Sequence, residues 1–198
     1  MKVLIIDNYD SFTYNLVQYF QKINGLELSV YRNDEIDLDA VGSYDAVVLS
    51  PGPGLPKDAG IMPALLKRYS ATKPILGICL GEQAIAECFG GELFNLERVY
   101  HGVESAVHIL EKKEPMFDGL ENSFVAGRYH SWAVSKNNFP EELVITAEDD
   151  KGVVMAIRHK EYEVAGLQFH PESIMTVQGM QMIENWVLNI KDKIQTPV

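Results

Sequence analysis

A single cysteine stands between glycines in the segment Gly77-Ile78-Cys79-Leu80-Gly81, directly after the apolar run Ile75–Ile78. Small residues around a nucleophile at a strand-to-helix turn are typical of a nucleophile elbow, where a strained turn exposes the reactive side chain. The first turn of the following helix would favour the thiolate over the thiol. The segment therefore predicts a cysteine nucleophile, and the alternative is a buried structural cysteine.

A histidine and an acid lie two residues apart in Gln168-Phe169-His170-Pro171-Glu172-Ser173, again directly after an apolar run. A cysteine nucleophile needs a base within hydrogen-bond reach, and the base needs a third group that fixes its tautomer. The proline between them has a locked φ, so His170 and Glu172 can project the same way, with Nε2 facing the sulfur. The alternative is a surface histidine beside a solvated acid. Ligands of open α/β sheets bind beyond the carboxyl ends of strands, and this position favours the catalytic interpretation.

A third strand end carries Ser50-Pro51-Gly52-Pro53-Gly54. Glycines let a ligand approach the backbone, and exposed N–H groups in such a loop can bind a developing oxyanion. The amide of Leu80, just past Cys79, is the natural second donor. Proline and glycine alternation by itself marks only a tight turn.

Apolar runs alternate with amphipathic segments through the first ninety residues. We expect strands at 2–6, 27–31, 45–49 and 75–78, and helices at 10–22, 61–69 and 79–89. Asp10 or Ser11 is expected to cap the first helix. This alternation requires right-handed crossovers and a parallel sheet.

The middle of the chain has a different pattern. Short β-like runs at 105–110, 124–126, 143–147 and 153–158 predict an antiparallel or mixed extension of the sheet. A strand at 163–169 and a helix at 177–190 then complete the fold. We expect an α/β protein with a three-layer, open, mostly parallel sheet flanked by helices and an antiparallel β extension, in a single domain spanning 1–198.

Composition narrows the classes of function. The chain has 198 residues, of which 46% are hydrophobic, and its formal net charge is −11. Such an acidic balance argues against nucleic acid, which binds through Lys and Arg. Two cysteines give no disulfide framework, and no run reaches the ~18 apolar residues of a membrane span. We therefore expect a cytoplasmic protein that binds neither nucleic acid nor a membrane.

Four segments together resemble one known family. The chain is similar to the triad-type (class I) glutamine amidotransferases, and within them to the subunits of anthranilate synthase and aminodeoxychorismate synthase. The likeness runs nearly end to end. It rests on the segments Asp7–Asn15, Ser50–Gly54 with Ala59-Gly60, Arg128-Tyr129-His130-Ser131, and Gln168–Ile174.

The resemblance implies a flavodoxin-like amidotransferase fold and a Cys-His-Glu triad. Cys79 would be the nucleophile, His170 the base and acid, and Glu172 the group that orients it. It also implies that L-glutamine is the substrate. The implied partner is a synthase subunit that uses chorismate, takes up the ammonia and forms a hetero-oligomer with this chain. No metal and no cofactor are implied in this subunit. Binding of glutamine and of the oxyanion would fall to Gly52, Pro53, Gly54, Leu80, Gln83, Ser131 and Trp132.

Two positions depart from the family pattern. Glu82 stands where the family has His, and Val103 stands where it tends to have Lys. A carboxylate near the thiolate would oppose its formation, so we expect Glu82 to point away from the sulfur and to be solvated or paired with a basic group.

Other interpretations stay open. One alternative is a stand-alone cysteine hydrolase such as a γ-glutamyl peptidase. Another is a degenerate, non-hydrolytic regulatory subunit. Within the amidotransferase interpretation, anthranilate synthase (tryptophan biosynthesis) and aminodeoxychorismate synthase (folate biosynthesis) are both candidate partners. His130 is expected to be a structural histidine, and the remaining histidines lack metal-ligand spacing.

Overall fold

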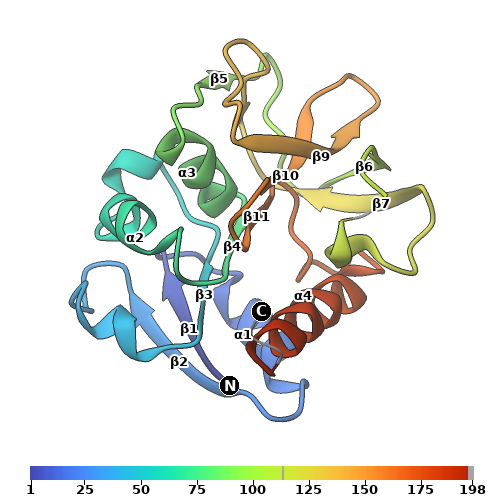
Figure 1. Ribbon diagram of the computed structural model, residues 1–198. Coiled ribbons are helices and arrows are strands. Elements are labelled where there is room, and N and C mark those ends of the chain that lie inside the picture. The colour runs from blue at the N-terminus through green and yellow to red at the C-terminus, as the bar shows by residue number, and fades with distance from the viewer. Residues whose placement is uncertain (113, 196–198) are drawn as a thin grey trace.

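A mixed sheet of nine strands forms the centre of the computed structural model, which describes residues 1–112 and 114–195 (Figure 1). Its strands, in spatial order, are β2 (Glu27–Arg32), β1 (Lys2–Asp7), β3 (Ala46–Leu49), β4 (Ile75–Ile78), β11 (Val164–Leu167), β10 (Val154–His159), β9 (Leu143–Asp149), β6 (Val103–Ile109) and β7 (Ser123–Arg128).

The sheet has a parallel half and an antiparallel half. The neighbours from β2 to β11 pair in parallel, and those from β11 to β7 pair antiparallel. The parallel strands follow the flavodoxin-like order, and ligands of such open sheets bind beyond the carboxyl ends of the strands. The predicted α/β class and the antiparallel extension are therefore confirmed.

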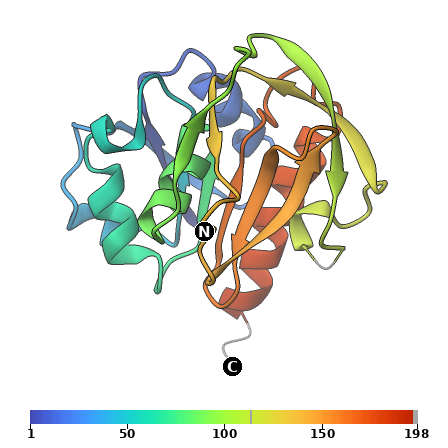
Figure 2. The same cartoon turned by 90° about the horizontal axis from the view of Figure 1, so that it is seen from above.

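Helices cover both faces of the parallel half (Figure 1). The helices α1 (Thr13–Gln21) and α4 (Gly179–Gln195) pack on one face, and α2 (Met62–Tyr69) and α3 (Leu80–Cys88) pack on the other. In Figure 2 the orange strands of the antiparallel half lie against the red helix α4. The three predicted layers are present.

The apolar run of β1 shows why this arrangement is stable. Its residues Val3, Leu4, Ile5 and Ile6 are all fully buried, with alternate side chains in the two core clusters on opposite faces. Each such side chain contributes about 1.5–3 kcal/mol on burial. A strand covered on both faces needs a continuous apolar run rather than alternation, and this is the pattern in the sequence.

The structure differs from the prediction at the start of α1. Its N-cap is Phe12 and no side chain caps it, so the expected cap at Asp10 or Ser11 is wrong. The Asp10 carboxylate instead accepts a hydrogen bond from the Phe12 amide, and Asp7 accepts from the Asp10 amide and the Thr13 hydroxyl. These local bonds compete with capping and hold the loop before the helix.

A second, two-stranded sheet was not predicted. It pairs β5 (Leu93–Asn95) with β8 (Trp132–Val134) in antiparallel fashion. Each strand has three residues, which is too short for a periodic pattern. Three short 3₁₀ helices complete the elements of the described chain: Ala40–Ser43, Pro56–Asp58 and Pro115–Phe117.

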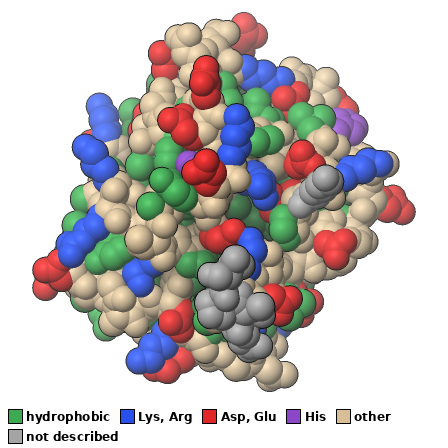
Figure 3. Space-filling model, in the orientation of Figure 1, with side chains coloured by type: hydrophobic (Ala, Val, Ile, Leu, Met, Phe, Trp, Pro, Cys, Tyr) green, Lys and Arg blue, Asp and Glu red, His purple; other side chains and the backbone are tan. Residues whose placement is uncertain are grey.

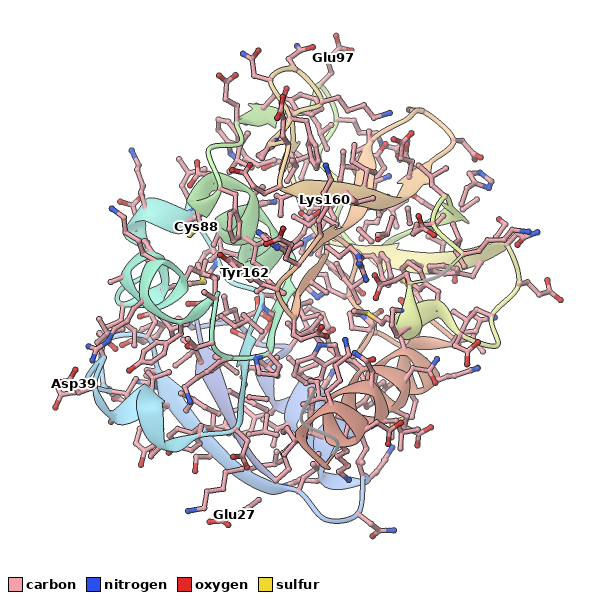
Figure 4. The ribbon with its side chains drawn as sticks, in the orientation of Figure 1. Glu27, Asp39, Cys88, Glu97, Lys160 and Tyr162 are labelled. Carbon is pink, nitrogen blue, oxygen red and sulfur yellow. The ribbon has the colours of Figure 1, made fainter. Side chains whose placement is uncertain are left out.

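The surface is mixed in charge. Acidic and basic side chains are interspersed over the face seen in Figure 3. Within residues 1–112 and 114–195, no helix has the length and apolarity that a membrane crossing requires. Figure 4 labels Cys88, the last residue of α3, and it lies a helix length away from Cys79.

Candidate active site

Cys79 lies at a strained turn between β4 and α3. Its φ of 52° and ψ of −99° place a residue with a side chain in a region that favours glycine, and such strain concentrates at functional sites. The flanking residues must be glycines because neighbouring backbone atoms leave no room for a Cβ at either position. A Cβ on Gly77 would lie 2.4 Å from the carbonyl carbon of Gly81, and one on Gly81 would lie 2.6 Å from the Leu49 oxygen.

The elbow aims the start of α3 at the sulfur. The Cys79 amide donates to the Leu167 carbonyl at 2.7 Å, which ties the turn to the end of β11. The Leu80 amide, the first of the helix, makes no hydrogen bond to any group of the described chain. A free N–H at a helix N-terminus attracts negative charge, so this position suits an oxyanion.

His170 and Glu172 form a buried pair beyond the end of β11. The Nδ1 and Oε1 atoms are 2.7 Å apart, and the residues are 2% and 3% exposed. The His170 backbone is held from two sides: its amide donates to the Gly127 carbonyl at 3.0 Å, and its carbonyl accepts from the Thr176 hydroxyl at 2.7 Å. The ring is therefore oriented by a carboxylate, which leaves Nε2 for another partner.

The His170 ring carries a raised pKa. Burial alone would lower it, but the charge of Glu172 and the interactions with Cys79 and the Glu172 carboxylate together raise the pKa well above its ordinary value. Nε2 makes no standard hydrogen bond within the described chain, so Cys79 is the remaining partner on that side. The raised pKa favours the protonated imidazole, which can act as an acid.

Two aromatic rings fix His170 from the sides. The Phe12 and Tyr129 ring centroids lie 5.5 Å and 4.8 Å from the imidazole centroid, both in edge-on geometry. The Tyr129 hydroxyl is also 3.2 Å from the Ser173 Oγ. Sequence reasoning missed both residues as parts of the site. Phe12 and Tyr129 come from segments far from His170 in the chain, and nothing in their own neighbourhoods predicts the contact.

A cavity of about 150 Å³ opens beside the sulfur. It contains all but one of the positions that the resemblance implied for substrate binding. Leu80 does not line it; its side chain packs under the loop, where a Cβ on Gly52 would lie 2.9 Å from Leu80 Cδ2. The lining residues are Gly52, Pro53, Gly54, Cys79, Gln83, Tyr129, His130, Ser131 and Trp132.

The loop after β3 is fastened to the loop after β1. The Asn8 side chain donates to the Ser50 carbonyl at 2.8 Å, and the Asn8 amide donates to the Ser50 hydroxyl at 2.9 Å. A Cβ on Gly52 would lie 2.6 Å from the Asn8 Cβ. The glycine therefore lets the two loops meet and leaves its amide without a hydrogen-bond partner among the described residues.

Glu82 departs from its expected environment. It is fully buried, and within the described chain neither carboxyl oxygen has a hydrogen-bond partner. Its stem packs over β11, since a Cβ on Gly166 would lie 2.5 Å from Glu82 Cγ. Burial raises the pKa of this carboxyl well above its ordinary value. The expectation that Glu82 is solvated or paired with a base is wrong; the carboxyl is buried without a partner, which favours its protonated form.

His130 lines the cavity with both ring nitrogens engaged. Nδ1 lies 2.7 Å from the Trp132 carbonyl oxygen, and Nε2 accepts a hydrogen bond from Arg128 Nε at 3.0 Å. Burial and the charge of Arg128 lower its pKa to about 3. It is therefore neutral and held in place, as expected of a structural histidine.

Known proteins share this chain's sequence and fold. The model of the family "Glutamine amidotransferase class-I" matches residues 4–190. Over 194 residues the chain is 44% identical to the "Aminodeoxychorismate/anthranilate synthase component 2" of Bacillus subtilis, covering 97% of this chain and 98% of that protein. It is also 44% identical over 194 residues to the "Bifunctional protein TrpGD" of Thermotoga maritima, covering 96% of this chain but only 32% of that protein.

Solved structures agree on the fold. A Thermoplasma acidophilum protein described as a subunit of GMP synthase has a TM-score of 0.87 at 24% identity, covering 98% of this chain and 96% of that one. At this identity the likeness shows the architecture alone.

Proposed function

The chain belongs to the class-I glutamine amidotransferases, and from that premise we propose that it hydrolyses L-glutamine at Cys79 and delivers ammonia to a chorismate-using synthase subunit. The observation that carries the proposal is the meeting of a cysteine at a strained elbow with a buried His170–Glu172 pair. A degenerate binding subunit would have no need of that strain or of the oriented imidazole.

The first half of the reaction is acyl transfer to sulfur. The Cys79 thiolate attacks the side-chain carboxamide carbon of glutamine, and the free amides of Gly52 and Leu80 receive the oxyanion. His170, protonated because of its raised pKa, gives its proton to the leaving nitrogen. The C–N bond breaks, ammonia leaves, and a γ-glutamyl thioester remains.

The second half returns the enzyme to its starting state. Neutral His170 takes a proton from water as the water attacks the thioester carbonyl. The C–S bond breaks, glutamate leaves, and Glu172 stabilises the imidazolium that has formed. Besides the substrate, each step uses only water and the side chains and backbone amides of this chain.

The wall opposite the sulfur fits the charged end of glutamine. All three carbonyls of His130, Ser131 and Trp132 already accept hydrogen bonds, from Tyr100 N, Leu96 N and the side chains of His130 and Gln83. The amides of His130 and Ser131 make no hydrogen bond to any described residue, so this wall has N–H donors to offer the cavity. We assign it to the α-carboxylate of the substrate, with the carboxamide directed at Cys79.

Exposed apolar side chains that lie close in the chain to residues contacting the site offer a docking surface to the synthase subunit. We name as the apolar rim Tyr14, Val99, Ile174 and Val177, which are 66%, 66%, 93% and 83% exposed. Ile174 follows the triad segment closely, and Tyr14 follows Phe12, which packs on His170. Apolar side chains this exposed mark interaction sites. Docking there would cover the cavity, so that ammonia passes to the partner before water protonates it.

Two synthases are candidates for the partner, anthranilate synthase and aminodeoxychorismate synthase. The Bacillus subtilis relative bears the names of both aminodeoxychorismate and anthranilate synthase in one protein. That double name favours a second candidate function, in which this chain serves aminodeoxychorismate synthase. Product analysis separates the two, because the amino group enters a different position of the chorismate ring in each.

The experiment uses the complex with the synthase subunit copurified from the native host. Cys79→Ser should abolish glutamine-dependent product formation, a loss on the order of 10⁴-fold or more, while ammonium salts still support synthesis. Cys88→Ser is the matched control and should leave both activities intact, because Cys88 lies at the far end of α3. Glutamine-dependent synthesis near the wild-type rate in Cys79→Ser would overturn the proposal.

A second variant tests the docking surface. Ile174→Asp should weaken binding of the synthase subunit by roughly 30-fold, because it places a charge in an apolar contact. Leu188→Asp on α4 is the control, since that side chain is also exposed (56%) but lies outside the apolar rim. Equal affinities for the two variants would contradict docking at this rim.

A further inference from the structure

A buried chain of polar contacts leads from β9 to the cavity. Arg128, at the end of β7, is fully buried and donates from Nη1 to the Asp149 carboxylate at 2.6 Å. Its guanidinium carbon lies 3.6 Å from the centroid of the Tyr100 ring, and its Nε donates to His130 Nε2 at 3.0 Å. The next link is His130 Nδ1, which lies 2.7 Å from the Trp132 carbonyl oxygen.

The arginine decides which nitrogen of His130 carries the proton. A guanidinium has only donors and stays charged, so Nε2 must accept from it. The ring is neutral, because its pKa is lowered to about 3, so the proton sits on Nδ1, which then donates to Trp132 O. In the other tautomer the Nε2–H of His130 would face the N–H of Arg128, and the unprotonated Nδ1 would face the Trp132 carbonyl oxygen. The geometry admits one tautomer.

The Trp132 carbonyl is a junction of the substrate pocket. Besides His130 it accepts a hydrogen bond from Gln83 Nε2 at 2.9 Å, and the same nitrogen donates to Gln168 Oε1 at 3.0 Å. The segment His130–Trp132 and Gln83 both line the cavity. A change in the orientation of this carbonyl would therefore displace two sides of the pocket at once.

We propose that Arg128 is a positioning residue for glutamine: anchored by Asp149, it selects the His130 tautomer that holds the Trp132 carbonyl and so presents the pocket's free N–H groups to the substrate. The proposal rests on the glutaminase function given above. It concerns binding of substrate rather than the chemistry at sulfur, since within the described residues neither Arg128 nor His130 makes a hydrogen bond to Cys79 or to the Glu172 carboxylate.

The charge balance explains why an arginine is needed. Arg128 and Asp149 neutralise each other, with side chains 1% and 4% exposed. Removing the positive charge would leave a buried carboxylate unpaired, which destabilises proteins severely. Lysine keeps the charge for Asp149 but presents one ammonium instead of a planar fork, and it cannot serve Asp149 and His130 Nε2 in the same geometry.

The first test is therefore Arg128→Lys in the complex with the synthase subunit. We expect KM for glutamine to rise about tenfold, with kcat changed by less than about threefold, because an interaction that positions substrate is lost and the triad stays intact. Arg158→Lys is the matched control; Arg158 lies in the same sheet, in β10, and its pairing with Glu114 is away from the cavity.

A pair of variants at His130 tests the direction of the effect. An asparagine amide can replace Nδ1–H as the donor to Trp132 O, whereas leucine has no donor. We expect His130→Leu to raise KM as much as Arg128→Lys does, and His130→Asn to keep KM within about threefold of wild type. A merely structural role would make the two His130 variants equally poor.

The spectroscopic test needs no activity. The ¹⁵N shifts of the His130 ring at neutral pH should show the Nδ1–H tautomer in the wild type and a mixture of tautomers in Arg128→Lys. An unchanged tautomer together with an unchanged KM in Arg128→Lys would overturn the inference, as would a fall in kcat without a rise in KM. A wild-type complex that does not hydrolyse glutamine would instead contradict the proposed function, and the tautomer measurement would still judge the role of Arg128.

Discussion

Two glutamates next to the site are both buried, and they have opposite roles. Glu172 follows β11 and is 3% exposed; Glu82 lies in the first turn of α3 and is fully buried. Glu172 has His170 at 2.7 Å, whereas Glu82 has no hydrogen-bond partner among the described residues. The carboxylate of Glu172 pairs with an imidazole, whereas burial without a partner favours the protonated form of Glu82.

The difference shows that the partner, rather than burial, decides what a buried acid does. Burial raises the pKa of Glu82 because nothing nearby favours the ionised form. At His170, burial acts to lower the pKa and is overcome mainly by the charge of Glu172. This raised pKa favours a protonated carboxyl one turn from the nucleophile, and a protonated carboxyl exerts little field on the sulfur.

Removing the charge of Glu172 should have the largest effect. Glu172→Gln keeps the shape but loses the carboxylate that holds the His170 proton, so kcat should fall by as much as ~10⁴-fold. The raised pKa of His170 should also fall, and the alkaline limb of the pH profile of kcat should move to lower pH. Steady-state kinetics across pH measure both, and an unchanged kcat would mean that another group orients His170.

Glu82→Gln should affect stability rather than catalysis. Glu82 has a higher pKa in the folded protein than in the unfolded chain. Below the unfolded-state pKa both states are protonated and Glu82 does not change the free energy of unfolding. As the pH rises from there toward the folded-state pKa, the protein loses stability. The variant cannot ionise, so its stability advantage over the wild type should grow by about 1.4 kcal/mol per pH unit above the ordinary glutamate pKa. Urea unfolding at several pH values measures this. The exposed Glu121→Gln is the control, and a flat difference for Glu82→Gln would mean that Glu82 is ionised in the folded protein.

Gly166→Ala probes the packing that buries Glu82. The added Cβ would lie 2.5 Å from Glu82 Cγ, so the side chain or α3 must move, at a cost of about 1–3 kcal/mol. In a Glu82→Ala background the clash with Cγ is gone, although contacts with the remaining Cβ and Cα persist. A double-mutant cycle by urea unfolding should therefore show coupling between the positions. Additive effects would contradict the contact.

The smallest effect concerns the nucleophile itself. If Glu82 is neutral, Glu82→Gln should move the pH dependence of Cys79 alkylation by less than about half a pH unit. Rates of reaction with iodoacetamide across pH measure this, with Cys88→Ser used to remove the second thiol. A fall of about one unit or more would show that an ionised Glu82 restrains the thiolate.

The sequence predicts the parts of the site whose causes are local. The turn at Cys79 follows from two glycines that leave no room for a Cβ, and the His170–Glu172 pair follows from a spacing of two residues across a proline. The strands β1, β3, β4 and β11 were predictable for the same reason, since each is a short apolar run covered on both faces.

Parts that depend on distant segments were beyond sequence reasoning. The environment of Glu82 is set by Gly166 on β11, and the rings on His170 come from Phe12 and Tyr129. The strand β8, which carries Trp132, exists only through its pairing with β5. Local patterns cannot show such contacts, because the partner lies tens of residues away in the chain.

Covalent labelling of the site tests the central claim most directly. A glutamine analogue with an electrophilic carbon in place of the carboxamide should alkylate the folded wild-type protein once, at Cys79, and peptide mass spectrometry should find the adduct on that residue. Added L-glutamine should protect it, and Glu172→Gln should slow the labelling. An adduct on Cys88 instead, or labelling of Cys79 that glutamine does not slow, would contradict the account of Cys79 as the glutamine-hydrolysing nucleophile.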